Sequence, residues 1–340
     1  MTVIGDEILT LVNSQKLSDL HIKPDVAIAI RVDGDIMHSS SKVLSPKDID
    51  DFITHFLSAD QLSHFKETLD QDLAIEIGDY RFRVNILHTS KGVSLVLRKI
   101  DTVIPSAETL KIPLVAQDMV NKPNGLILVT GPTGSGKSTS LAAMVDMVNK
   151  SHSGHILTIE DPIEYIHSSQ KCIVTQREIG RDALSFSQAL RASLREDPDI
   201  ILVGEMRDRE TIQLALTAAE TGHLVFGTLH TSGAPNTINR IIDVFPPEQQ
   251  PQVRAQLAQS LQLAMTQRLF KRADGSGRVA AFEIMVANPA VRNLIRDNKV
   301  FQILSIMQTA RGDGMLTMDA SIEQLIATGQ ISPESVNSAH

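Results

Sequence analysis

Residues 126–139 read Leu-Ile-Leu-Val-Thr-Gly-Pro-Thr-Gly-Ser-Gly-Lys-Ser-Thr, and this stretch decides the fold. The apolar run that opens it predicts a buried strand of a parallel sheet, because such strands are covered on both faces. The glycines that follow allow the backbone to curl until successive N–H groups point at one anion. The spacing G-x-x-x-x-G-K-S, placed between a strand and a helix, therefore predicts a phosphate-binding loop.

The same loop indicates the ligand. Lys137 can reach the β- and γ-phosphates of a nucleoside triphosphate, and Ser138 can offer its hydroxyl to Mg²⁺. The helix that starts under the phosphates adds the favourable charge of its N-terminus. We expect a nucleoside triphosphate to be held by a continuous set of residues: Gly131, Pro132, Thr133, Gly134, Ser135, Gly136, Lys137, Ser138 and Thr139.

Composition bounds the class of protein. The chain has 340 residues, 42% of them hydrophobic and 21% charged, as in a globular protein long enough for two domains. The net charge of −8 and the aromatic content of 4% argue against a nucleic-acid partner. The single cysteine, Cys172, excludes an internal disulfide and fits a reducing compartment. Because we find neither signal-peptide features nor a run near the ~20 apolar residues of a membrane span, we expect a cytoplasmic protein.

Residues 1–100 predict a small α+β domain with an antiparallel sheet. Apolar residues at helical spacing follow Ser45-Pro46, which predicts a helix with Ser45 as its cap. The pair Asp33-Gly34 predicts a hairpin turn. Segments that alternate with the period of a strand lie at residues 26–32, 74–77, 80–85 and 93–98.

A linker is predicted at residues 101–118, where Pro105 and Pro113 punctuate the chain. Beyond it strands and helices alternate, which is typical of an α/β domain with a parallel sheet covered by helices. The strands are predicted at 126–130, 155–159, 200–203 and 224–228, and the helices from about 137, at 185–195 and at 208–221. From about residue 248 to 340 the chain looks mainly helical, so the second domain is expected to span 119–340.

An acidic cluster follows the strand predicted at 155–159, at the edge where α/β sheets bind their ligands. Glu160, Asp161 and Glu164 would repel one another unless a cation or water lies among them. Such carboxylates could equally cap the next helix, because acidic residues favour helix starts.

A second carboxylate follows the strand predicted at 200–203. Gly204 comes directly after that strand, so Glu205 takes the acidic position. We assign Glu205 to orienting or activating the attacking water rather than to direct contact with a metal ion. A surface glutamate without a role is the alternative.

Histidines and arginines form two further candidate groups. His223 and His230 bracket the strand predicted at 224–228, where they could sense a γ-phosphate and link it to a subunit interface, or simply pack. Alternation places Arg81 and Arg83 on one face of a strand, where two like charges are unfavourable without an anion. Arg98 lies in another strand-like segment, and ordinary solvated charges remain the alternative for all three arginines.

These motifs occur in an order that is found in one protein family. The chain resembles the pilus-retraction (twitching-motility) ATPases of the secretion-ATPase superfamily over essentially its whole length. The residues that carry the resemblance are Ser18-Asp-Leu-His-Ile, Arg31-Val-Asp-Gly-Asp, Arg81-Phe-Arg-Val-Asn, the phosphate-binding loop, the acidic box at 158–165, and the segments 189–199, 204–208, 221–231 and 240–246.

The resemblance implies a homohexameric ring whose subunits combine an N-terminal PAS-like domain with a RecA-like ATPase domain and a helical C-terminal region. It implies ATP and Mg²⁺ as ligands, with Lys137 on the phosphates and Ser138 on the metal ion. Glu205 takes the place of the catalytic glutamate, Glu164 that of the acidic-box residue, which acts on the metal through water, and His230 that of the histidine box. The basic residues implied to approach the phosphates from the N-terminal domain are Arg81, Arg83 and Arg98.

Two C-terminal segments favour retraction among the tasks of the superfamily. Residues 290–297 resemble a segment associated with retraction, and residues 315–320 are similar to the same branch. In the first, Val291, Leu294 and Ile295 form an apolar face, while Arg292 and Arg296 form a basic one. The alternative for this segment is an ordinary amphipathic surface helix. One cysteine cannot build the four-cysteine zinc module of assembly relatives, which disfavours the assembly motor.

The resemblance also implies partners and a location. It places the protein in the cytoplasm, at the inner-membrane face of a pilus machine, where it acts on a membrane-embedded platform protein; a second retraction ATPase is an open alternative. Two other functions stay open from the sequence. One is a related secretion or conjugation motor, and the other is an accessory subunit that binds nucleotide without hydrolysing it.

Overall fold

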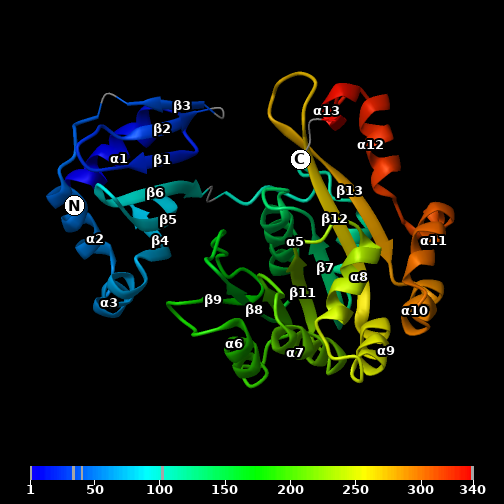
Figure 1. Cartoon of the computed structure of the whole chain (residues 1–340). Helices are drawn as coiled ribbons and strands as arrows, with labels where there is room; N and C mark the ends of the chain where they lie inside the picture. The colour runs from blue at the N-terminus through cyan, green and yellow to red at the C-terminus, as the bar shows by residue number, and fades with distance from the viewer. Residues whose placement is uncertain (1, 33–34, 40, 101–102, 338–340) are drawn as a thin grey trace. The chain divides into compact units, whose positions relative to one another are not determined.

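The computed structural model describes residues 2–32, 35–39, 41–100 and 103–337. The chain divides into two compact units, Met1–Val103 and Ile104–His340, and each is described by itself (Figure 1). Across the described residues, we find no helix with both the length and the apolar character that crossing a membrane requires.

The first unit is a six-stranded antiparallel sheet with three helices packed on one face. Its elements are β1 (Asp19–Ile22), β2 (Ala29–Val32), β3 (Asp35–His38), β4 (Asp70–Ile77), β5 (Tyr80–Thr89), β6 (Gly92–Ile100), α1 (Val3–Ser14), α2 (Pro46–Phe56) and α3 (Ala59–Thr68). The strand order is β3-β2-β1-β6-β5-β4. Alternate residues of β5, namely Phe82, Val84 and Ile86, enter the core together with residues of β1, β2, β4 and β6, and the helices cover that face. The edge strand β3 is exposed along its whole length.

Most predictions for this unit are confirmed. The segments 74–77, 80–85 and 93–98 lie within β4, β5 and β6, whereas the strand predicted at 26–32 is shorter and begins at Ala29. The helix predicted after Ser45 is α2, and Ser45 exchanges hydrogen bonds with Asp48 in a capping box. The turn predicted at residues 33–34 lies outside the described residues; on either side of it β2 and β3 pair antiparallel.

The second unit is built on a seven-stranded sheet. Its strands are β7 (Gly125–Thr130), β8 (His155–Glu160), β9 (Ile173–Glu178), β10 (Ile200–Val203), β11 (Leu224–Leu229), β12 (Leu261–Lys271) and β13 (Arg278–Val286). Its helices are α4 (Leu114–Met119), α5 (Lys137–Ser151), α6 (Phe186–Ser193), α7 (Arg209–Glu220), α8 (Ala234–Asp243), α9 (Gln250–Ser260), α10 (Pro289–Arg296), α11 (Ile303–Thr309), α12 (Met318–Ala327) and α13 (Pro333–Asn337), with short 3₁₀ turns η1 (Val300–Gln302) and η2 (Arg311–Asp313). The strand order is β13-β12-β7-β11-β10-β8-β9, and all neighbours are parallel except β12 and β13.

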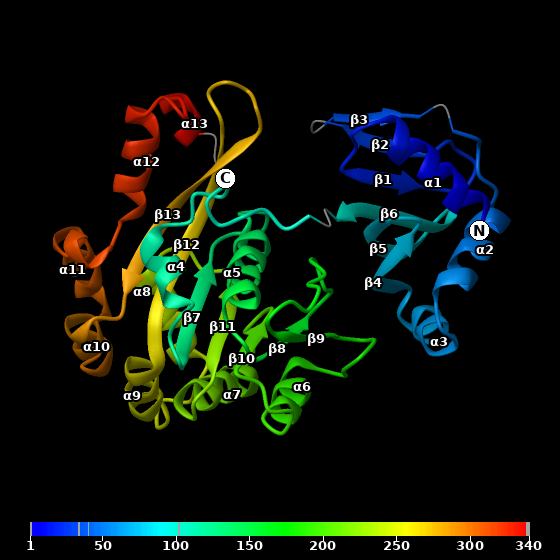
Figure 2. The ribbon, with the colours of Figure 1, turned by 180° about the vertical axis from the view of Figure 1, so that it is seen from behind.

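Helices cover both faces of this sheet. Leu126 and Leu128 of β7 enter a core shared with helices α6 to α11, whereas Ile127 and Val129 enter a core shared with α4 and α5. Figure 1 shows α8 in front of the sheet, and Figure 2, seen from behind, shows α4 on the opposite face. Because both faces are covered, every residue of β7 is buried, as the apolar run predicts.

The strands and helices predicted between residues 126 and 229 are confirmed as β7, α5, β8, α6, β10, α7 and β11. The prediction of a mainly helical region from about residue 248 to 340 is wrong in one respect, because it contains the long strands β12 and β13. β12 is rich in Leu, Gln, Ala and Met, which favour helices, but its pairing with β7 and its burial override that local preference. The segment predicted as a linker at 101–118 contains the start of α4; residues 101–102 of it lie outside the described part.

The apolar face of helix α10 packs against the core of the second unit. Val291 and Ile295 are buried in the core, and Leu294 packs against it. The two arginines, predicted to form one basic face, have different surroundings. The Arg292 guanidinium donates to the carbonyl oxygens of Ala258, at 2.6 Å, and of Gln259, at the end of α9. Arg296 is exposed and donates to the side chain of Asn293.

Arg292→Ala is therefore expected to lower the free energy of unfolding by about 2 kcal/mol, because carbonyl groups at the end of α9 lose a charged donor. Arg296→Ala, the matched control, is expected to change it by less than about 0.5 kcal/mol. Chemical denaturation followed by circular dichroism measures both. Equal stability of the two variants would contradict the capping role of Arg292.

Candidate active site

The strand order brings the predicted motifs to one edge of the second sheet. Strands β7, β11, β10 and β8 are parallel neighbours in that order, so their carboxyl ends share one edge. The phosphate-binding loop follows β7, His230 follows β11, Glu205 follows β10 with one residue between, and the acidic box begins in the last residues of β8 and continues after it. Ligand sites of α/β sheets lie at this edge.

The loop after β7 is shaped by glycines at positions where a larger residue would be strained. Gly131 and Gly136 have φ angles of +139° and +88°, in the region that favours glycine. A Cβ at Gly131 would collide with the carbonyl oxygen of Gln267, and one at Gly136 would lie 2.8 Å from Gln267 Nε2. Gln267, on β12, is buried and its Oε1 accepts from Ser140 Oγ at 2.8 Å. The loop therefore packs against β12 through Gln267.

Lys137 lies inside this loop, with its side chain mostly buried. Its Nζ donates to the carbonyl oxygens of Gly131 at 2.8 Å and Pro132 at 3.0 Å. Burial lowers the pKa of Lys137, and the charges of Glu205 and Glu164 oppose this shift. Both carboxylates are therefore close enough to act on the ammonium group.

His230 connects Lys137 with Glu205. Its Nδ1 lies 3.4 Å from Lys137 Nζ, and its Nε2 lies 3.2 Å from Glu205 Oε1. An ammonium group only donates and a carboxylate only accepts, so a neutral ring here carries its proton on Nε2. Glu205 also forms an ion pair with Arg207. The structure thus brings together Lys137, His230 and Glu205, which the sequence separates widely.

His223 does not belong to this group, although the sequence suggested that the two histidines act as a pair. His223 precedes β11, so it lies at the opposite edge of the sheet from His230. Its Nδ1 contacts the carbonyl oxygen of Ala218 at 3.0 Å, near the end of α7. Its contacts are those of a structural residue.

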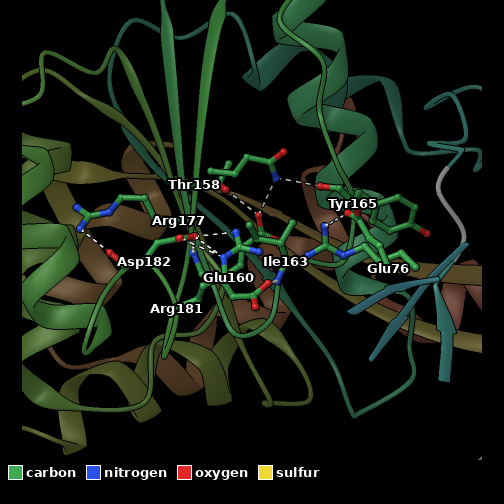
Figure 3. Close-up of polar contacts among 11 residues, drawn as sticks. Glu76, Thr158, Glu160, Ile163, Tyr165, Arg177, Arg181 and Asp182 are labelled. Atoms are coloured by element: carbon green, nitrogen blue, oxygen red, sulfur yellow. Dashed lines mark hydrogen bonds and ion pairs between the residues drawn. The ribbon is translucent and has the colours of Figure 1, made fainter. Parts of the chain in front are cut away.

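In the acidic box, Glu160 is the carboxylate most changed by its surroundings. Its Oε1 accepts from Thr158 Oγ1 at 2.7 Å, as Figure 3 shows, and from Gln176 Nε2 at 3.2 Å. Burial raises the pKa of Glu160 to about 7; the charge of Glu164 adds to the rise, and the two hydrogen bonds oppose it. Glu160 is therefore partly protonated near neutral pH when no cation is bound.

The oxygen groups of the site fit Mg²⁺ and a triphosphate. Ser138 lies in the first turn of α5, Glu164 is half-buried after β8, and hydroxyl and carboxylate oxygens are the ligands that Mg²⁺ prefers. Within the described residues, the buried Ser135 Oγ has no hydrogen-bond partner, which suits an oxygen atom of a bound anion. Thr139 Oγ1 lies 3.1 Å from Tyr165 Oη and so ties the loop helix to the acidic box.

The three candidate arginines belong to the first unit, and each lies beside a carboxylate of its own sheet. Arg98 Nε lies 2.9 Å from Asp19, Arg83 lies 3.6 Å from Asp72, and Arg81 lies 3.7 Å from Glu76. Arg83 and Arg98 are also cross-strand partners. Acidic neighbours therefore reduce the like-charge repulsion that the sequence indicated, so the repulsion alone does not require an anion.

Sequence reasoning missed two groups of this site. Gln267 gave no signal, because β12 lies in the region predicted to be helical. Gln176, whose amide reaches Glu160, lies on β9, a strand that was not predicted. The raised pKa of Glu160 could have been predicted from the sequence, because a glutamate at the end of an apolar strand is expected to be desolvated.

The chain matches one protein family over nearly its whole length. Residues 1–338 match the family described as Type II/IV secretion system protein. The type IV pilus retraction ATPase PilT of Pseudomonas aeruginosa is 51% identical over 329 residues, 96% of this chain and 95% of that protein. The twitching motility protein of Neisseria gonorrhoeae is 51% identical over 306 residues, 90% of this chain and 82% of that protein. Among solved structures, the pilus retraction motor PilT with bound ADP has a TM-score of 0.91 at 42% identity, and the match covers 100% of this chain and 97% of that one.

Lys137→Ala is expected to weaken nucleotide binding by about 100-fold or more, because two charge-assisted contacts to phosphate are lost. Lys150→Ala, at the exposed end of the same helix, is the control and should bind as the unaltered chain does. A fluorescent nucleotide titration measures both. Unchanged affinity of Lys137→Ala would place the nucleotide elsewhere.

Glu160→Gln is expected to change the pH dependence of stability in the nucleotide-free and metal-free protein. The folded chain holds the Glu160 proton up to about pH 7, whereas the unfolded chain releases it near 4.5. Stability from this group is therefore full at low pH and falls as the pH rises from 4.5 to 7. The glutamine stays neutral, so the variant should be more stable at about pH 8 by up to about 3 kcal/mol, and nearly equal to the unaltered chain at about pH 5.

Urea denaturation at the two pH values measures the difference, with the exposed Glu248→Gln as the control. A stability difference that is the same at both pH values would show that Glu160 is ionised throughout.

Proposed function

The chain belongs to the type II/IV secretion system protein family, and we propose that it is an ATPase motor that powers the retraction of a type IV pilus. Hydrolysis is supported above all by one observation: His230 contacts both Lys137 and Glu205. We call these three residues in contact the His230 row. Retraction is supported by the 51% identity to proteins named for pilus retraction and twitching motility, over nearly the whole chain.

ATP binding starts at the loop after β7. The backbone N–H groups of the loop and of the N-terminus of α5 donate hydrogen bonds to the phosphate oxygens. Lys137 exchanges its bonds with the carbonyl oxygens of Gly131 and Pro132 for bonds with the β- and γ-phosphates. Ser138 and, through water, Glu164 would hold Mg²⁺, which neutralises charge on the phosphates. Gln267 keeps the loop in place during this exchange, because it packs against both Gly131 and Gly136.

Hydrolysis requires a water molecule in line with the γ-phosphate. Glu205 accepts a hydrogen bond from that water and orients it. Arg207 and His230 both contact the Glu205 carboxylate and limit its rotation. His230 contacts the lysine as well as the glutamate, so a movement of Lys137 toward the phosphates changes the hydrogen bonds of His230. Binding of the γ-phosphate can thus change the contacts of Glu205 through the His230 row.

The remaining parts of this function follow from the family resemblance. We propose a homohexameric ring in which Arg81, Arg83 and Arg98 approach the phosphates and complete the site. Closure around ATP would exclude water and strengthen each charged contact, and loss of phosphate would release the arginines and let domains rotate. A closed ring requires a head-to-tail interface between subunits.

The load and the location are proposed on the same ground. The ring would act in the cytoplasm on the platform protein of the inner membrane and draw pilin subunits out of the fibre, with or without a second retraction ATPase. A secretion or conjugation motor of the same family is the second candidate load. Neighbouring genes distinguish the two, since pilus genes support retraction and a secretion or conjugation cluster redirects the assignment.

Glu205→Ala is expected to keep nucleotide affinity within about twofold and to reduce the rate of phosphate release by about 100-fold or more, because the water loses the group that orients it. Glu323→Ala, an exposed carboxylate of α12, is the control and should hydrolyse at the unaltered rate. Nucleotide titration and steady-state phosphate release measure the two quantities.

Hydrolysis at the unaltered rate by Glu205→Ala would contradict the role of Glu205. Absence of hydrolysis in the unaltered chain would favour the accessory-subunit function. In cells, Glu205→Ala should leave pili on the surface and abolish twitching; unchanged twitching would point to another load.

A further inference from the structure

Glu283, on β13, is a buried carboxylate that the mechanism above does not use. Glu283 is only 7% exposed. Its Oε1 accepts a hydrogen bond from the backbone N–H of Ala234 at 2.7 Å, and the carboxylate also accepts from the backbone N–H of Met318. These two groups lie at the starts of α8 and α12. One carboxylate therefore joins the N-termini of two helices that are far apart in the sequence.

Helix α8 depends on this contact because it has no side-chain cap of its own. Its N-cap residue is Gly233, which makes no side-chain hydrogen bond. The first N–H groups of a helix need acceptors, and a negative charge at this end is favourable. Glu283 supplies both from a distant strand. Helix α12 is different, since its N-cap Thr317 already accepts from the backbone N–H of Ala320.

The start of α8 also holds the loop that carries His230. Thr231 Oγ1 lies 2.7 Å from Thr237 Oγ1, and Asn236 Nδ2 donates to the carbonyl oxygen of Ser232 at 2.8 Å. The loop from β11 is thus bonded to the first turn of α8. A shift of that turn would move His230 relative to Glu205, which lies 3.2 Å away.

The strand that carries Glu283 is fixed on its other sides. Ile284 and Leu316 exchange backbone hydrogen bonds of 2.7 and 3.0 Å ahead of α12. Glu283 is the cross-strand partner of Thr266, whose Oγ1 lies 2.9 Å from Thr130 Oγ1 at the end of β7. Glu283 therefore acts on α8 from a support that is also bonded to the strand before the phosphate-binding loop.

We propose that Glu283 is a positioning residue for ATP hydrolysis, whose carboxylate holds the start of α8, and through it His230, in place against Glu205. This inference rests on the proposed function of the His230 row and adds a residue outside the four motifs at the sheet edge. Its effect falls on turnover, because none of the atoms that Glu283 contacts belongs to the phosphate-binding loop.

The test is a double-mutant cycle of Glu283→Gln and His230→Ala in the full chain. Glu283→Gln keeps the shape of the side chain and removes its charge. We expect it to lower kcat by about tenfold with nucleotide Kd changed by less than about twofold. In the His230→Ala background the same substitution should lower kcat by less than about twofold further, because the residue through which it acts is already gone.

Thr317→Ala is the matched control, since it removes the cap of α12 and leaves α8 untouched; its kcat should stay within about twofold of the unaltered chain. A comparable kcat loss in Thr317→Ala would indicate general destabilisation and overturn the proposal. If Glu283→Gln does not fold, Glu283→Asp replaces it in the cycle, because it keeps the charge and withdraws the oxygen from Ala234.

An equal loss of kcat from the Glu283 variant with and without His230 would overturn the proposal, as would an unaltered kcat in Glu283→Gln or in His230→Ala. None of these outcomes affects the proposal that the chain hydrolyses ATP, which Glu205→Ala tests separately.

Discussion

The parallel alignment of β7, β11, β10 and β8 is the constraint on which the rest of the site depends. Four segments that are separated by up to a hundred residues reach the same edge because their strands are hydrogen-bonded in one direction. The apolar character of these strands fixes that arrangement, since both faces are buried under helices. Lys137, His230, Glu205 and the acidic box are therefore neighbours as a consequence of the sheet, before any contact between their side chains forms.

The side-chain contacts then divide the site into a fixed part and a part that can move. Gln267 and the positive φ angles of Gly131 and Gly136 leave the loop little freedom. Lys137, in contrast, is bonded to carbonyl groups and to His230, and both sets of bonds can be exchanged for bonds with phosphates. If Lys137 changes partners as we propose, its contact with His230, which also contacts Glu205, would give ATP a direct way to alter the position of Glu205. The loop of His230 is bonded to helix α8, and the start of α8 is bonded to Glu283 on β13, which pairs with β12.

The sequence was sufficient for the central sheet and for the motifs at its edge, because long apolar runs and the glycine-lysine loop are strong local signals. It was insufficient for β12, whose leucines, glutamines and methionines favour a helix until β7 is available as a partner. Gln267 and Glu283 were missed for the same reason, since the role of Gln267 exists only after β12 has paired with β7 and that of Glu283 only after β13 has paired with β12. The pairing of His223 with His230 failed although the strand between them was predicted, because that strand carries the two residues to opposite edges of the sheet.

The most direct test of this account is a crystal structure of the chain with a non-hydrolysable ATP analogue and Mn²⁺ in place of Mg²⁺. We expect Lys137 Nζ to have left the carbonyl oxygens of Gly131 and Pro132 and to lie on the terminal phosphates, with the anomalous peak of Mn²⁺ beside Ser138 Oγ and the γ-phosphate facing Glu205. A nucleotide bound while Lys137 keeps its bonds to the loop, or a terminal phosphate directed away from Glu205 and His230, would contradict the account.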